Sequence, residues 1–266
     1  VTAVASNVSS LLNVAPTAVA IYNCVNPPYH QWAKLWPPMA ASFLTYAEKT
    51  GAVLVTCSNL YGYGPVDVPM TESLPLNAPG VNGKVRANMW MEAKAMHDAG
   101  IIKATEVRGS DYVSASNQSR VGARVIPKVL AGKPAQVLGA IDQKHTWTYP
   151  LDVARLMKIV ASDSRAWGKA WHVPSNEAKT QHEVVSELAS EAGVSNPKLS
   201  SVPNVIWNLI ALFNPLMRAL KETAYQMQRP YILDDSAARE TFGMQPTQWN
   251  QILNEVVAET RASLKK

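Results

Sequence analysis

Continuous apolar runs alternate with amphipathic segments along the first part of the chain. Residues 18–25 and 52–57 are short apolar runs rich in β-branched side chains, and each is predicted to form a buried strand. Between them, residues 37–49 carry apolar side chains at helical spacing, and Gly51 stands just past the expected helix end. Buried strands separated by helices are typical of a parallel sheet covered on both faces. The same pattern predicts helices at 84–99 and 121–131 and further strands at 103–108, 136–138 and 170–173.

The chain after residue 150 is predicted to be mainly helical. Asp152 precedes an apolar periodic segment as a candidate N-cap, and Thr180 with Glu183 has the spacing of a capping box. Residues 204–225 form an amphipathic stretch rich in Trp, Leu and Phe. We expect this stretch to pack in a core, with a dimer contact or a membrane-surface helix as alternatives. We therefore predict an α/β domain over 1–150 and an interleaved, mostly helical substrate lobe over 151–266, with strand 170–173 returning to the main sheet.

Composition narrows the class of protein. Apolar residues make up 47% of the 266 residues, which excludes a disordered or fibrous chain. The net charge of +5 comes from scattered residues, so no nucleic-acid surface is expected. No segment reaches the roughly 20 apolar residues of a membrane helix, so no membrane partner is expected. Two cysteines exclude a disulfide scaffold and fit a cytoplasmic protein, and the five histidines lack metal-ligand spacing, so no metal is expected.

Polar and aromatic residues follow the predicted strands. Asn26 and Pro27 come directly after the first strand, and Asn59, Tyr61 and Tyr63 lie at or beyond the end of the second. Ligands dock at the carboxyl ends of parallel strands, so we expect these residues to line a cleft, with turn formation or packing as the alternative. The irregular segment 61–83, with four Pro and four Gly, is long enough to favour a functional loop. The strand at 103–108 is followed in the same way by Ser110, Asp111 and Tyr112.

Three further positions leave two interpretations open. Arg108 lies inside a predicted strand, where a buried ion pair and a ligand contact are equally compatible with the pattern. Arg120 and Arg124 are cations at helical spacing, which suits either an anionic ligand or a solvated face. Trp147 lies in an aromatic turn before a predicted helix, where it either shapes the turn or contacts substrate.

Several motifs occur in order along the chain. TCSNLYG at 56–62 is followed by TESLP at 71–75, EVRGSDY at 106–112 and HTWTYPLDVA at 145–154, and LDDSAARETFG at 233–243 lies near the C-terminus. Together they resemble the extended short-chain dehydrogenase/reductase family, and more narrowly its NAD-dependent epimerase/dehydratase branch. The resemblance implies a Rossmann-like sheet with helices on both faces, NAD or NADP as cofactor, and a small-molecule substrate.

The chain departs from that family near its N-terminus. The family opens with a strand and a glycine-rich turn that binds pyrophosphate, but no G-x-G-x-x-G occurs in this sequence. The strand at 18–25 corresponds to the family's fourth strand. In a sheet ordered 3-2-1-4-5-6, loss of strands 1 and 2 leaves strand 4 as an apolar exposed edge. We expect a truncated sequence, or a partner chain that supplies the missing strands.

A second departure concerns the proton relay. The family uses a Ser or Thr, a Tyr, and a Lys four residues after that Tyr, whose charge lowers the Tyr pKa. None of the nine Tyr here has a Lys four residues on. By alignment, Cys57 takes the Ser/Thr position, Asn82 the Tyr position and Arg86 the Lys position. Substitute proton donors are sought at Tyr61, Tyr63 and Lys84.

The resemblance assigns three kinds of role to this chain. The catalytic candidates are Cys57, Tyr61, Lys84 and Arg86. The cofactor-binding candidates are Asn26, Pro27, Arg86, Gly109, Ser110 and Asp111. The substrate-binding candidates are Asn59, Tyr63, Tyr112, Arg120 and Trp147.

The implied function is an NAD(P)-dependent epimerase, dehydratase or reductase that acts on a small carbonyl, an alcohol or a nucleotide sugar. A hydride would move between the nicotinamide and a carbon of the substrate. The absent relay Tyr favours an alternative, a non-catalytic member of the same fold that binds a dinucleotide or another ligand. The absent glycine turn favours a further alternative, an inactive fragment. A homodimer is left open.

Overall fold

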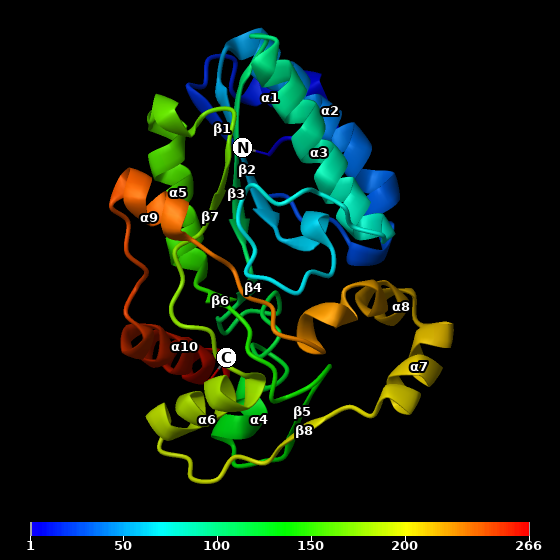
Figure 1. Cartoon of the computed structure of the whole chain (residues 1–266), viewed down its shortest axis with the longest axis vertical. Helices are drawn as coiled ribbons and strands as arrows, with labels where there is room; N and C mark the ends of the chain where they lie inside the picture. The colour runs from blue at the N-terminus through cyan, green and yellow to red at the C-terminus, as the bar shows by residue number, and fades with distance from the viewer. Residues whose placement is uncertain (1, 266) are drawn as a thin grey trace. The chain divides into compact units, whose positions relative to one another are not determined.

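Four parallel strands form the main sheet in the order β1–β2–β3–β7 (Figure 1). A computed structural model of the chain describes residues 2–265. Figure 1 shows the helices α2 and α3 on one side of this sheet and α5 on the other, so the predicted parallel α/β layering is confirmed. The elements of this layer are α1 (Val8–Val14), β1 (Ala20–Asn23), η1 (Tyr29–Gln31), α2 (Trp32–Thr50), β2 (Val53–Asn59), η2 (Tyr61–Tyr63), α3 (Val81–Asp98), β3 (Lys103–Gly109), α5 (Pro150–Ser162), η3 (Ser164–Ala166) and β7 (Ala170–His172).

Helix α2 is longer than the pattern predicted. It begins at Trp32 and includes Pro37 and Pro38, although proline cannot donate to the carbonyl four residues back. Both prolines are exposed, so water can hydrate the carbonyls that lose their partners. The buried Trp32 and Trp36, one helical turn apart, hold the inner face of the helix against the protein. Gly51 ends the helix with a φ of 72°, as its position predicted.

Strand β1 lies at an edge of this sheet, as expected for the strand at 18–25. Its hydrogen-bonded neighbour within residues 2–265 is β2, in a register that pairs Asn23 with Thr56. The side chain of Tyr22 on this strand is 46% exposed. On the covered face, Ile21 packs against a core that contains Phe43 and Leu54.

Two expected helix starts need correction. Helix α3 begins at Val81, before the predicted start at 84, so Asn82 lies in its first turn. Asp152 is the third residue of α5 and lies within its first turn, where it is not the N-cap. Its two carboxylate oxygens accept hydrogen bonds from the amide and hydroxyl of Thr247, each at 2.8 Å. The long-range partner therefore outweighs the capping role that local sequence suggested.

The chain divides into two compact units. The first comprises Val1–Gly64, Glu72–Gly109 and Val153–His172, and the second comprises Pro65–Thr71, Ser110–Asp152 and Val173–Lys266. Most of α5 and all of β7 lie in the first unit, while Ser110–Asp152 lies in the second, so the chain passes between the two units several times. No helix within residues 2–265 has the length and hydropathy needed to cross a bilayer.

The second unit has a core built by three helices that contact one another, α4, α6 and α10. Helix α6 begins with the predicted capping box, in which Thr180 and Glu183 each bond to the other's backbone N–H. The elements of this unit are β4 (Asp111–Tyr112), α4 (Ile126–Leu130), β5 (Ala135–Val137), β6 (Trp147–Thr148), α6 (Gln181–Glu191), β8 (Leu199–Ser201), α7 (Asn204–Phe213), α8 (Pro215–Glu222), η4 (Ala224–Met227), α9 (Ser236–Phe242) and α10 (Trp249–Ser263).

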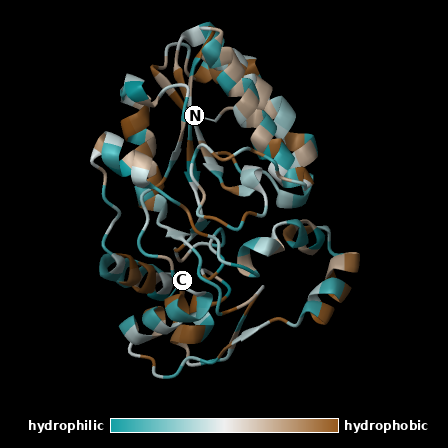
Figure 2. Ribbon diagram, viewed as in Figure 1, coloured by the Kyte–Doolittle hydropathy of each residue, from teal (hydrophilic) through white to brown (hydrophobic). Residues whose placement is uncertain are grey.

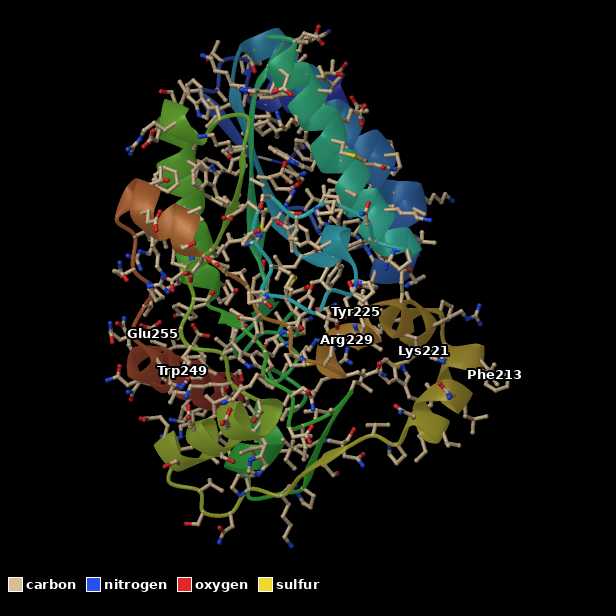
Figure 3. All side chains as sticks on the ribbon, viewed as in Figure 1. Phe213, Lys221, Tyr225, Arg229, Trp249 and Glu255 are labelled. Atoms are coloured by element: carbon tan, nitrogen blue, oxygen red, sulfur yellow. The ribbon has the colours of Figure 1, made fainter. Side chains whose placement is uncertain are left out.

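Residues 204–225 only partly pack in a core. Trp207 of α7 is buried, and its indole N–H donates to the carbonyl of Met217 at 3.2 Å. The other face of α7 is apolar and open: Val205 is 78%, Leu209 60% and Phe213 84% exposed. Figure 2 shows the hydrophobic colouring along this helix, and Figure 3 shows the Phe213 side chain pointing outward. The core packing expected for this stretch therefore holds for one helix face.

Candidate functional site

The carboxyl ends of β1, β2 and β3 gather several of the candidate residues of the first unit. Cys57 and Asn59 lie at the end of β2, and Asn59 is paired in register with Gly109 of β3. Asn26 and Pro27 follow β1, where Asn26 is exposed and the carbonyl of Pro27 accepts a 3.0 Å hydrogen bond from the Trp32 indole. The expectation that these residues share one edge of the sheet follows from parallel pairing, and the register agrees with it.

Arg86 is held by two tryptophans. Its guanidinium carbon lies 4.5 Å from the ring centroids of both Trp32 and Trp36. Its Nη1 donates to the backbone carbonyl of Cys57 at 3.5 Å, and the residue is only 6% exposed. Aromatic faces stabilise a cation through their negative quadrupole, so the guanidinium is fixed beside the end of β2.

Asn82 occupies a structural position at the start of α3. Its Nδ2 donates to the carbonyl of Tyr29 at 3.4 Å, and the side chain is buried. The next residue, Gly83, lies so close to Tyr61 that an added Cβ would be 2.7 Å from the Tyr61 carbonyl oxygen. An amide cannot supply a proton near neutral pH, so this helix start anchors the neighbouring loop without offering acid–base chemistry.

The two remaining catalytic candidates differ in their surroundings. The ring of Tyr61 lies 6.0 Å from that of Tyr29 in an edge arrangement and 6.1 Å from that of Trp32. These aromatic neighbours fix the ring of Tyr61, which is partly exposed. Lys84 is exposed on α3, whereas Asn82 and Arg86 are on the buried face of the same helix.

Tyr63 belongs to a buried polar network. Its hydroxyl accepts a 2.6 Å hydrogen bond from Arg108 and lies 2.8 Å from Nε2 of His172. Arg108 also donates to Glu106 at 2.6 Å, and both side chains of this ion pair are 3% exposed. Glu72 accepts from the backbone N–H of His172 at 2.8 Å. Burial raises the pKa of Tyr63 to about 12, so its phenol keeps its proton at neutral pH.

The sequence did not decide between an ion pair and a ligand contact for Arg108, and it did not indicate Glu106, Glu72 or His172 as site residues. The ion pair could have been predicted, because Glu106 and Arg108 are two residues apart in one strand and therefore face the same side. The contacts of Glu72 and His172 have no local signal, since they join residues 100 positions apart.

A second polar cluster lies in the second unit. Asp111 accepts a 2.5 Å hydrogen bond from Arg120, and its carboxylate lies 3.2 Å from Nε2 of His145. Ser110 Oγ is also 3.2 Å from that same nitrogen, while Nδ1 of His145 faces the carbonyl of Gln226. A catalytic triad needs the carboxylate and the hydroxyl on opposite ring nitrogens, so this arrangement is not one.

The charge of Asp111 is stabilised by its neighbours. Burial alone would raise the pKa of Asp111, but Arg120 and His145 outweigh that effect and hold it below its usual range. Of the substrate candidates in this unit, Trp147 is buried and donates to the carbonyl of Lys179, and Tyr112 accepts through its carbonyl from Ser119.

The end of β2 can be tested for its fit to a dinucleotide. Ser58 Oγ is buried without a hydrogen-bond partner within residues 2–265, and Ser58, Asn59, Arg86 and Arg108 line one small internal space. Glu106 also lines this space, which is too small to hold a water molecule, so it is the polar lining and not the volume that suits a ligand group such as a ribose hydroxyl. The residues match the nicotinamide half of a dinucleotide in their chemistry alone, while the glycine turn for the pyrophosphate is absent from the sequence.

Comparison with solved structures finds the same fold in several of them. The chain is similar to dTDP-glucose 4,6-dehydratase from Bacillus anthracis str. Ames in complex with NAD, at 18% identity over 99% of this chain and 79% of that one, with a TM-score of 0.77. It is similar to UDP-glucose 4-epimerase from Thermotoga maritima with UDP-glucose, at 15% identity over 98% and 83% of the two chains and a TM-score of 0.77. It is also similar to RMD from Pseudomonas aeruginosa complexed with NADPH, at 15% identity over 99% and 87% and a TM-score of 0.76.

At these identities the structures establish the fold, and the predicted Rossmann-like sheet is confirmed. A search of curated proteins found no match. The model of the NAD dependent epimerase/dehydratase family matches residues 39–173, which is half of the chain and contains β2, β3, β7 and the residues at their ends. The chain therefore belongs to the NAD dependent epimerase/dehydratase family.

Proposed function

We propose that this protein binds NAD or NADP and moves a hydride between the nicotinamide and a carbon of a small carbonyl or alcohol substrate. A nucleotide sugar is the favoured substrate class, because two of the similar structures are named as enzymes of dTDP-glucose and UDP-glucose. The observation that carries the proposal is the cluster of Cys57, Asn59 and Arg86 at the end of β2, inside the segment that matches the family.

Each residue at this edge has a role in the proposal. Arg86 supplies a fixed charge and donors for the ribose or phosphate, because Trp32 and Trp36 hold its guanidinium in place. Asn26 and Pro27 line the cofactor side, next to the end of β1. Bound NAD(P) would supply the carbon that accepts or gives the hydride, and Cys57 and Asn59 would lie near the reacting carbon.

Tyr61 is the favoured proton donor among the candidates. It is partly exposed, whereas Tyr63 is 2% exposed and already bonded to Arg108 and His172. A donor must reach the substrate within hydrogen-bond distance, so exposure decides between the two phenols. Lys84 stays a weaker candidate, because it lies on the exposed face of α3.

The candidates of the second unit act as positioning residues in this proposal. Asp111 and Arg120 neutralise each other, and Trp147 is buried. They position the backbone of Ser110 and Tyr112 within the second unit. The Ser110 amide donates to Thr148 at 2.9 Å and the Tyr112 carbonyl accepts from Ser119, so both groups are already bonded within the protein.

The test is a fluorescence titration of the full chain with NADH and with NADPH. Saturable binding is expected, and Arg86→Gln should weaken it about tenfold, since a hydrogen bond to a charged group contributes about 1.5–3 kcal/mol. Lys94→Gln is the matched control, because Lys94 is an exposed cation on the same helix. Absence of binding, or equal loss in both variants, would contradict the proposal.

The alternative function, a silent ligand-binding member of the family, is favoured by the contacts at the relay positions. Asn82 is tied to Tyr29, and Arg86 is held by two indoles. The double variant Asn82→Tyr with Arg86→Lys rebuilds the relay of the family. If the double variant is active and the native chain is not, the native chain is a silent member of the family. If the native chain is active and the double variant is not, the native residues at these positions carry out a different chemistry.

We further propose that a second copy of the chain covers the exposed face of α7. No charged residue occurs between Lys198 and Arg218, so two copies can pack this face together without like-charge repulsion. Light scattering after size exclusion should give a dimer for the native chain and a monomer for Leu209→Asp. Leu151→Asp is the matched control, since Leu151 is similarly exposed on α5. A native chain that stays monomeric would contradict this proposal.

A further inference from the structure

The two cysteines of the chain lie on neighbouring strands. Cys24 follows directly after β1, and Cys57 lies in β2. The register of β1 and β2 pairs Asn23 with Thr56, one residue before each cysteine, so the next pair in register is Cys24 with Cys57. Neighbouring strands are about 4.7–4.9 Å apart, which lies within the range of about 4.4–6.8 Å that Cα atoms span across a disulfide.

The two side chains also point to the same face of the sheet, because residues paired in register on parallel strands share a face. Both residues are thiols in the structure. The neighbouring Cys57 thiol and partial burial raise the pKa of Cys24, so Cys24 keeps its proton at neutral pH. Cys24 is exposed and Cys57 is partly exposed, so a small reagent can reach the pair from solvent.

Arg86 adds a fixed positive charge at this place. Its Nη1 donates to the backbone carbonyl of Cys57 at 3.5 Å. The guanidinium lies with Ser58 on one face of the sheet, so the Cys57 side chain points to the opposite face. Because the neighbouring thiol and burial raise the pKa of Cys24, Cys57 is the thiol that attacks first, and Cys24 is the one that resolves the mixed disulfide.

From the strand register and the shared face of the two side chains we propose that Cys24 and Cys57 form a reversible disulfide at the carboxyl ends of β1 and β2. The oxidant is a low-molecular-weight disulfide such as glutathione disulfide. Cys57 sulfur bonds to one glutathione sulfur, the glutathione S–S bond breaks, and the first glutathione leaves with the proton from Cys57. Cys24 sulfur then bonds to Cys57, and the second glutathione leaves with the proton from Cys24. The protein thiols are oxidised by two electrons and glutathione disulfide is reduced.

The disulfide would act on the proposed cofactor site, and this part rests on the proposed function. Asn26 and Pro27 lie within three residues of Cys24, and Arg86 is bonded to the carbonyl of Cys57. A covalent link between the strand ends fixes both segments and removes the Cys57 thiol from the site. Oxidation should therefore weaken binding of NADH about tenfold or more, the effect of losing one charge-assisted contact.

The native full chain is equilibrated in glutathione buffers with an increasing proportion of glutathione disulfide. It is then alkylated under denaturing conditions, and its intact mass is measured. Both thiols should lose their reactivity together, with the mass lower by two hydrogens, and dithiothreitol should restore them. Cys24→Ser and Cys57→Ser should each stop at a mixed glutathione disulfide or an unmodified thiol. A native chain that keeps two reactive thiols at the most oxidising ratio, or carries only mixed disulfides, would overturn the proposal.

NADH titration of the reduced and oxidised chains separates this inference from the proposed function. Weaker binding after oxidation supports the effect on the cofactor site, and equal binding overturns it. If neither form binds NADH, the proposed function fails, while the mass measurement still decides whether the disulfide forms.

Discussion

Removing the charge of Glu106 tests whether the buried network of the first unit is as tightly coupled as the structure indicates. The substitution Glu106→Gln keeps the shape of the side chain and removes the anion that faces Arg108. Both partners of this ion pair are 3% exposed and their atoms are 2.6 Å apart. Water cannot hydrate the guanidinium once its counter-charge is lost, so the charge stays buried and uncompensated.

The expected magnitude follows from this burial. Breaking a buried ion pair by removing one partner costs about 3–5 kcal/mol. Arg108 keeps its 2.6 Å hydrogen bond to Tyr63 and its contact with the Trp90 ring, at 5.8 Å from the centroid. These contacts offset part of the loss, so we expect the lower end, about 3 kcal/mol. A domain is typically stable by about 5–15 kcal/mol, so the change would remove a large share of the total.

Urea unfolding followed by tryptophan fluorescence measures this loss. The matched control is Asp98→Asn, because the Lys94–Asp98 pair is 44% and 55% exposed and such pairs contribute about 0.3–0.5 kcal/mol. The double variant Glu106→Leu with Arg108→Met should recover most of the loss, since no charge is then left buried. If Glu106→Gln costs no more than Asp98→Asn, the argument from burial is wrong.

Three further predictions concern single residues. Tyr63→Phe should reduce the unfolding free energy at neutral pH. Because burial raises the pKa of Tyr63 to about 12 in the folded state, the native chain loses stability as pH rises from about 10, the ordinary Tyr pKa, and its difference from the variant should shrink. Unfolding measurements at several pH values, with tyrosinate absorbance to follow ionisation, check this, and a constant difference would count against it. Gly83→Ala should cost about 1–3 kcal/mol, because the added Cβ would lie 2.4 Å from Cβ of Ala78, and thermal unfolding measures it; an unchanged midpoint would refute the close approach. Arg120 and His145 outweigh burial and lower the pKa of Asp111, so its carboxylate stabilises the native chain above about pH 4 and this stabilisation is lost as pH falls. Asp111→Asn should therefore be less stable than the native chain above about pH 4, and the difference should shrink in acid. A difference in unfolding free energy that stays the same at all acidic pH values would contradict this.

Parts of the candidate site could be anticipated from sequence because parallel strands share one carboxyl edge. The sequence predicts Asn59 at a strand end, and the register pairs it directly with Gly109, which the family resemblance names as a cofactor contact. The stacking of Arg86 between two indoles could not be anticipated. Its position came from alignment with a relay lysine, but its surroundings depend on Trp32 and Trp36 from a helix about fifty residues away in sequence.

The sequence by itself determined the local elements: the apolar strands, the capping box at Thr180 and the left-handed helix end at Gly51, since each depends on residues within a few positions. Tertiary structure decided where local rules compete with distant contacts. Pro37 lies inside helix α2, and Asp152 bonds to Thr247 instead of capping a helix. The register of β1 and β2, which makes Cys24 and Cys57 the next pair, depends on the packing of the whole sheet and cannot be read from the residues of either strand alone.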